Sequence, residues 1–108
     1  MNQLGESINF IDESDKNCKI CVDEYFTQFL VKKTENLKKI NLKDLKSARI
    51  LTKEHDEQQY PIGFRITLEL ENKQSIHEYL LHESASKSDM IWLKSLRLMF
   101  DLIFTSGS

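Results

Sequence analysis

A series of short alternating segments along residues 6–83 is the feature that most restricts the fold of this chain. Seven segments read as β-strands separated by polar turns, namely 6–12, 18–22, 26–33, 38–44, 46–53, 63–70 and 75–83. The most regular of them predicts that Phe64, Ile66, Leu68 and Leu70 face inward. Since no helical pattern separates these segments, parallel strands are excluded. The sequence therefore predicts an antiparallel barrel or sandwich.

A single helical pattern follows the predicted strands. It begins near Ser86 or Ser88, where Ser86 and Asp89 match a capping box, and it runs to about Ile103. Its apolar stripe recurs at steps of four, three and four residues, as Trp92, Leu96, Met99 and Ile103. A second apolar ridge is formed by Leu93, Phe100 and Phe104. We expect a helix that covers an open end of the sheet and buries Trp92, Leu96, Met99 and Ile103 in the core.

These patterns predict one domain over residues 6–104, with tails at 1–5 and 105–108. Its class is α+β, mainly β: a seven-stranded antiparallel barrel or sandwich capped by one C-terminal α-helix. A content of 40% hydrophobic and 30% charged residues is typical of a folded domain. The apolar C-terminal segment carries Asp89, Lys94, Arg97 and Asp101, so it is not expected to span a bilayer. Residues 1–10 show no signal-peptide pattern.

The order of seven strands and one tryptophan-bearing C-terminal helix resembles the pleckstrin homology (PH) superfold. The segment 38–50 looks like the fourth strand, helical turn and fifth strand of that fold, and 63–100 looks like its last two strands and helix. Trp92, Leu96 and Arg97 match the W-x-x-x-L-R helix of membrane-binding PH domains, including those of phospholipase C enzymes. The resemblance implies a noncatalytic module that works at a cytoplasmic membrane face.

The front of the chain is similar to the inner membrane complex sub-compartment proteins of apicomplexan parasites. In those proteins a strand, an acidic turn and a cysteine-containing strand precede an I-x-L-x-D-L/I segment, which INLKDL at 40–45 matches here. One hypothesis for this chain is therefore a PH-like protein-interaction scaffold whose membrane attachment comes from elsewhere, such as an acylated N-terminus.

Basic residues are concentrated in one part of the chain. Residues 32–53 hold eight basic and two acidic residues, a net charge of +6, whereas the whole chain carries −2. In PH domains that bind phosphoinositides, the headgroup lies among three loops of the barrel. The resemblance places Lys32, Lys33, Lys38 and Lys39 beside one of these loops, Lys73 in another and Lys16 in the third. We therefore expect these six lysines to attract anionic lipid weakly.

The first of these loops departs from the pattern of tight headgroup binders, since Asp12, Glu13 and Asp15 surround Lys16. Carboxylates near a bound phosphate group reduce the affinity of the protein for that group, because like charges repel. The sequence thus favours a PH-like module at the cytoplasmic membrane periphery that binds phosphoinositide or phosphatidic acid weakly. The alternative is a PH-like protein-interaction scaffold without headgroup binding. A protein partner is expected under both hypotheses, but the sequence does not identify it.

Other functional classes find no support in the sequence. No phosphate loop, nucleophile elbow or paired-carboxylate motif indicates an enzyme, and no cofactor is expected. Cys18 and Cys21 lack the further ligands of a zinc site, and His77 and His82 are spaced for opposite faces of a strand, so no metal is expected. Basic residues without interleaved aromatic residues argue against nucleic-acid binding.

Overall fold

The computed structural model describes residues 7–53 and 60–105, so the predicted tails lie outside it except Thr105. It contains β1 (Ile8–Asp12), β2 (Asn17–Val22), β3 (Gln28–Lys33), β4 (Asn36–Asn41), the 3-10 helix η2 (Leu42–Asp44), β5 (Leu45–Thr52), β6 (Pro61–Leu70), β7 (Lys73–Leu81) and α1 (Lys87–Thr105). The predicted α+β class, with seven antiparallel strands before one helix, is confirmed.

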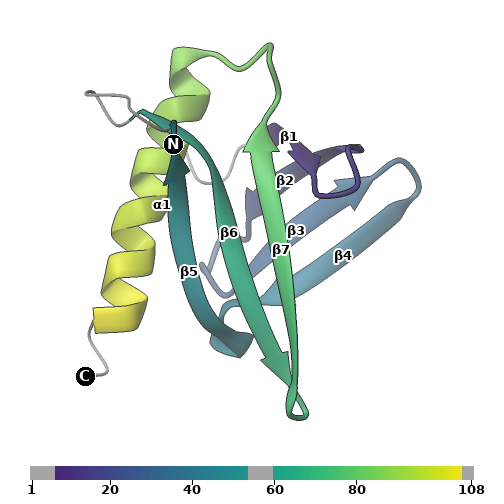
Figure 1. Ribbon diagram of the computed structural model, residues 1–108, viewed down its shortest axis with the longest axis vertical. Coiled ribbons are helices and arrows are strands. Elements are labelled where there is room, and N and C mark those ends of the chain that lie inside the picture. Colours follow the sequence, from purple (N-terminus) through teal and green to yellow (C-terminus); the bar gives the residue numbers. More distant parts are fainter. Residues whose placement is uncertain (1–6, 54–59, 106–108) are drawn as a thin grey trace.

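The strands form one bent sheet in the order β4-β3-β2-β1-β7-β6-β5. Its two halves meet at β1 and β7, which pair only through Phe10 with Leu81, Ile11 with Leu80 and Asp12 with Tyr79. Figure 1 shows β2, β3 and β4 crossing obliquely behind β5, β6 and β7, with α1 alongside β5. Within the described residues β4 and β5 do not pair, so the sheet is not closed into a barrel.

The core lies between the two halves of the sheet and α1. Alternation along the strands fills it, for example with Cys18, Ile20 and Val22 from β2. Six rings gather at its centre: Phe10, Phe29, Phe64, Tyr79, Trp92 and Phe100. Phe64, Ile66 and Leu68 are buried as predicted, but Leu70 is 53% exposed. Leu70 lies directly before a tight turn at Glu71 and Asn72, beyond the reach of the core.

The face of α1 that enters the core differs from the predicted stripe. Trp92 and Leu96 are buried, and the half-buried Met99 packs against the core. Ile103, however, is 36% exposed, so its prediction as a core residue is wrong. The helix is instead turned toward Leu93 and Phe100, which are fully buried. This orientation brings the Phe100 ring within 6.2 Å of Phe29 and 6.3 Å of Phe64. Ring contacts with β3 and β6 therefore determine which side of α1 is buried.

Two leucines of α1 provide a matched test of this packing. Leu96 is completely buried, whereas Leu98 is 66% exposed. Leu96→Ala should reduce the free energy of unfolding by about 2–5 kcal/mol because it leaves a cavity in the core. Leu98→Ala should change it by less than about 0.5 kcal/mol, since alanine keeps the helix propensity. Urea unfolding followed by Trp92 fluorescence measures both, and equal losses would contradict the orientation of α1.

Candidate functional site

A basic depression bordered by β1, β2 and the end of β3 is the first candidate site. Its volume is about 530 Å³, and its lining residues are Asn9, Lys16, Asn17, Cys18, Lys19, Lys32 and Thr34. We call it the lysine depression. Its lining contains no carboxylate, and its three lysines are all exposed.

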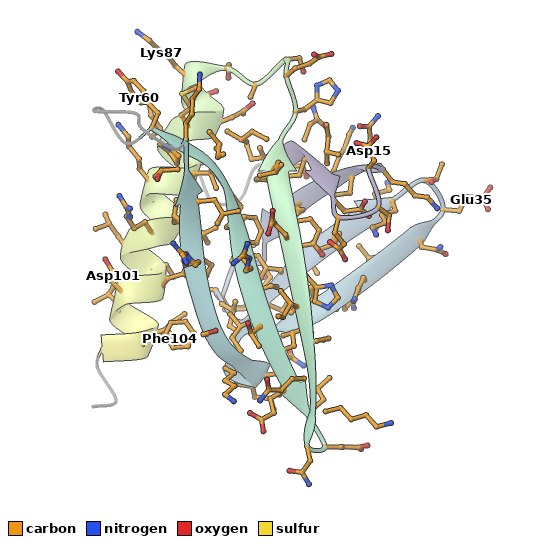
Figure 2. The ribbon with its side chains drawn as sticks, in the orientation of Figure 1. Asp15, Glu35, Tyr60, Lys87, Asp101 and Phe104 are labelled. Carbon is orange, nitrogen blue, oxygen red and sulfur yellow. The ribbon has the colours of Figure 1, made fainter. Side chains whose placement is uncertain are left out.

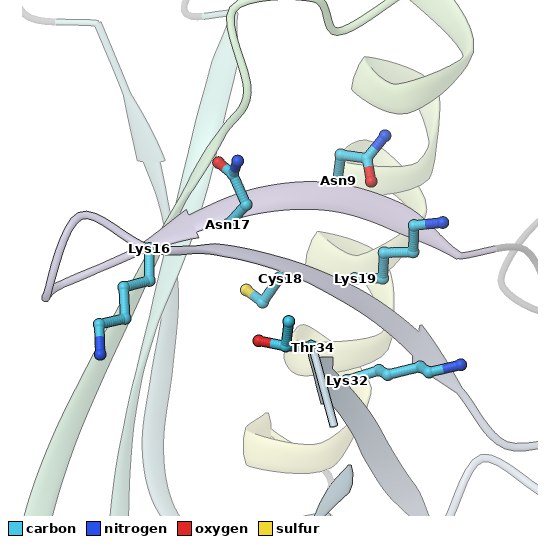
Figure 3. Close-up of a pocket in the computed structure, with 7 residues that line it drawn as sticks. All are labelled: Asn9, Lys16, Asn17, Cys18, Lys19, Lys32 and Thr34. Atoms are coloured by element: carbon cyan, nitrogen blue, oxygen red, sulfur yellow. The ribbon is translucent and has the colours of Figure 1, made fainter. Parts of the chain in front are cut away.

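Strand register brings two of these lysines together. Lys19 of β2 lies directly opposite Lys32 of β3, and Asn9 of β1 lies opposite Lys19 on the other side. In Figure 3, Lys19 and Lys32 extend toward the same side, whereas Lys16 points away from them at the turn end of β2. Directly opposite like charges destabilise a pair of strands, and no described carboxylate neutralises these two by an ion pair. An anion placed between them would relieve that repulsion.

Two further residues line the lysine depression, the exposed Thr34 and Cys18, whose side chain is largely buried in the core. Thr34 occupies the β3/β4 turn with a φ of 33°, which is unusual for a β-branched residue. Its hydroxyl can donate a hydrogen bond to an anion, and Figure 3 shows it beside Cys18. Burial raises the pKa of the Cys18 thiol to about 11, and this keeps it protonated and uncharged at neutral pH. Neither residue therefore adds negative charge to the lysine depression.

An ion pair inside the bent sheet accounts for one of the predicted site lysines. The ammonium of Lys33 pairs with Oδ2 of Asp12, whose side chain is 1% exposed. Oδ1 of Asp12 accepts hydrogen bonds from the backbone N–H groups of Ser14 and Lys16, each at 2.9 Å. Asp12 thus connects the β1/β2 turn to the end of β3, and Lys33 is occupied by this contact.

The pKa values of both partners reflect this contact. Burial acts to raise the pKa of Asp12, but the hydrogen bonds from Lys33, Lys16 and Ser14 outweigh it and hold that pKa below its ordinary value. The hydrogen bond to Asp12 raises the pKa of Lys33. Both side chains therefore remain ionised at neutral pH.

A second titratable pair lies on the same inner side of the sheet. Nδ1 of His77 on β7 lies 3.5 Å from Oε1 of Glu13, and Oε2 of Glu13 accepts a 3.3 Å hydrogen bond from the Glu78 backbone N–H. Burial, and then the charge of Lys38, lowers the pKa of His77. Lys38 lies opposite the buried Val31 in the register, so it points to this inner face. Glu13 is consequently directed away from the lysine depression.

The six predicted lipid-binding lysines are thus divided among three places. Lys16 and Lys32 line the lysine depression, and Lys39 lies on the same outer face opposite Leu30. Lys33 and Lys38 belong to the inner face, where Lys33 contacts Asp12. Lys73 follows the β6/β7 turn, which lies at the bottom of Figure 1, away from the β1/β2 and β3/β4 turns. Figure 2 shows Asp15 and Glu35 at those two turns on the right.

Lys19 is the lysine of the site that the sequence-based prediction missed, together with the polar residues Asn9, Asn17 and Thr34. The alternation of residues 18–22 places it on the outer face of its strand, opposite to Cys18, Ile20 and Val22. This pattern was sufficient to find its orientation, but not its cross-strand partner, because register depends on the pairing of β2 with β3.

No protein-family model matches this sequence, and no curated protein matches it. The resemblance to PH domains therefore stays a prediction. Within residues 7–53 and 60–105, no helix combines the length and apolarity needed to cross a membrane. The same residues contain no cluster of three or more histidine, cysteine or acidic side chains that could bind a metal ion.

The contact between Asp12 and Lys33 predicts a pH-dependent contribution to stability. Asp12→Asn keeps an oxygen for the turn but removes the ion pair, and it should reduce the free energy of unfolding at pH 7 by about 1–3 kcal/mol. Because the folded-state pKa of Asp12 lies below its ordinary value of 3.8, this contribution is complete above about pH 5 and is lost as the pH falls through the folded-state pKa. Urea unfolding at several pH values measures it.

Asp15→Asn is the matched control for this prediction. Asp15 lies in the same turn, is exposed and has a φ of 63°, a conformation that asparagine tolerates well. Its substitution should change the unfolding free energy by less than about 0.5 kcal/mol. An Asp12→Asn deficit that persists undiminished at pH 2–3 would show that Asp12 acts through packing rather than through its charge.

Proposed function

We propose that this protein is a noncatalytic PH-like module that binds anionic lipid weakly at a cytoplasmic membrane face. The observation that carries the proposal is the direct pairing of Lys19 with Lys32 in a depression without carboxylates. The phosphate of phosphatidic acid or of a phosphoinositide would lie between the two ammonium groups. The amide of Asn9 and the hydroxyl of Thr34 offer hydrogen-bond donors nearby.

The arrangement supports weak binding that depends on salt. Each lysine near an anionic membrane surface contributes about 1 kcal/mol, and salt reduces this attraction. The lysine depression holds no arginine for bidentate contact with phosphate, which argues against stereospecific recognition of one headgroup. Leu37 is 56% exposed and lies opposite Lys32 in the register, so it can add an apolar contact with the lipid.

The acidic first turn, which the sequence presents as an obstacle, opposes this function less than expected. Asp12 is buried and paired with Lys33, and Glu13 contacts His77 and the Glu78 backbone on the inner face. Asp15 alone of the three acids has no such contact among the described residues, and it lies at the tip of the turn (Figure 2). Two of the three carboxylates are thus directed away from the lysine depression.

The alternative function is a PH-like scaffold that binds another protein and reaches the membrane by other means. One observation favours it: the outward side of α1 exposes Ile91, Leu98 and Leu102 to 45%, 66% and 69%. Their spacing places them on one side of the helix, opposite to the buried Phe100. Exposed apolar stripes of this kind occur at protein-protein contacts.

Liposome sedimentation at low and at physiological salt tests the lipid proposal. Vesicles of phosphatidylcholine containing phosphatidic acid or a phosphoinositide should sediment the wild-type protein at low salt, and binding should decrease as salt is added. The double variant Lys19→Glu with Lys32→Glu should lower the partition coefficient at least about tenfold, since two attractions of about 1 kcal/mol each are reversed.

Lys43→Glu with Lys87→Glu is the matched control, because it produces the same change in net charge at exposed positions outside the lysine depression. It should retain most of the binding. If both double variants lose binding equally, the attraction depends on net charge and the assignment to Lys19 and Lys32 is wrong. If the wild type ignores anionic vesicles even at low salt, the lipid proposal fails and the scaffold function remains.

A further inference from the structure

The side of α1 that faces away from the sheet carries a heptad pattern. Ile91, Leu98 and Leu102 on this side are 45%, 66% and 69% exposed, so no described element covers them. Figure 1 accordingly shows the sheet on one side of α1 only. With Ser95 these residues recur at steps of four, three and four, the spacing at which two helices pack along a common seam. We call these four residues the outer seam.

Two opposite charges lie along one flank of the outer seam. Lys94 and Asp101 are both exposed and are seven residues apart, so they lie almost in line along the helix. Lys94 belongs to the N-terminal half of α1, where its Nζ lies 5.8 Å from the centre of the Tyr60 ring. Asp101 belongs to the C-terminal half. It also interacts within its own chain, but a carboxylate has about four lone-pair sites and can contact a second partner as well.

The outer seam is complementary to a second copy of itself in the reverse direction. In an antiparallel pair of α1 helices, one register places Ile91 against Leu102 of the second copy. The same register places Leu98 against Ser95 of the second copy, so each layer of the seam holds at least one large apolar side chain. Twofold symmetry repeats both layers.

The flanking charges agree with this register. It brings Lys94 within about two residues, or about 3 Å along the axis, of Asp101 of the second copy, a gap that a lysine side chain spans. Symmetry produces the contact twice. A parallel pair would instead place each charge beside its own copy, and an anionic membrane would attract Lys94 but repel Asp101. The charge pattern therefore favours an antiparallel second copy as the occupant of this side of α1.

We propose that two copies of this chain associate through the outer seams of their α1 helices, antiparallel about a twofold axis at the middle of the helix. Ile91, Leu98 and Leu102 supply the apolar contact, and the pairing of Lys94 with Asp101 sets the direction. One helix pair is a small interface, so the dissociation constant lies between about 1 µM and 1 mM. The association does not depend on lipid binding.

Sedimentation equilibrium without lipid, at low salt and at about 10 µM to 1 mM protein, tests the proposal. The mass of the wild-type protein should rise with concentration toward that of a dimer. Lys94→Glu alone and Asp101→Lys alone should each weaken association at least about tenfold, because both symmetric ion pairs become repulsions. Lys73→Glu is the matched control, since it reverses an exposed charge at the start of β7, and it should leave association unchanged.

An equimolar mixture of the Lys94→Glu and Asp101→Lys variants identifies the arrangement. In a mixed antiparallel dimer the two introduced charges face each other, as do the two native ones. Dimers should therefore re-form to within about threefold of the wild-type affinity, a gain that misfolded variants cannot show. In a parallel dimer the single variants would not lose association, because like charges already face each other there.

Leu98→Glu tests the apolar contact. It should abolish the dimer with the Trp92 fluorescence spectrum unchanged, whereas Leu70→Glu, at a leucine that is 53% exposed at the end of β6, should not. Unfolding measured well below the dissociation constant reports on the monomer, so Leu98→Ala has its small effect there. The proposal is overturned if the wild type stays monomeric at about 1 mM, if the single charge variants associate like wild type, or if their mixture forms no dimer.

Discussion

The ring of Phe64 is the contact on which the rest of the structure depends. Its centroid lies within 5.3–6.5 Å of five other rings, those of Tyr79, Phe10, Phe29, Phe100 and Trp92. These rings come from β1, β3, β7 and α1, so one side chain of β6 contacts both halves of the sheet and the helix. The preceding residue must be glycine, because a Cβ at Gly63 would lie 2.1 Å from the backbone oxygen of Tyr79. Close approach of β6 to β7 thus positions the cluster.

The ring cluster fixes the bend of the sheet, and the bend determines where the polar groups lie. β1 and β7 pair through only three residues, and the last of these pairs joins Asp12 to Tyr79. The ion pair of Asp12 with Lys33 begins at this junction and reaches across to the end of β3. It holds the β1/β2 turn, from which Lys16 borders the lysine depression. A core contact and one buried carboxylate together therefore define the candidate site.

Alternation was sufficient to predict most of the fold. It gave the seven strands, the inward position of Phe64 and the burial of Trp92, because period-two and helical patterns are local properties of the sequence. It failed at Ile103 because α1 is apolar on most sides, and only its ring contacts with Phe29 and Phe64 select the buried one. The candidate site was only partly predicted, because it also depends on contacts between distant segments. Lys19 lies opposite Lys32 only in the observed register of β2 and β3, and local sequence does not specify that register.

Consecutive lysines in a strand point to opposite faces of the sheet, so the lysines of the basic segment are divided between its two faces. Lys32 and Lys33 point to opposite faces, as do Lys38 and Lys39. The inward member of the first pair, Lys33, contacts Asp12, and the charge of the inward Lys38 acts on His77 beside Glu13. Of the acidic residues that oppose anion binding in the sequence, Asp12 is thus the counter-ion of Lys33, and Glu13 contacts His77. The net charge of the segment therefore overstates the positive charge that its outer lysines present.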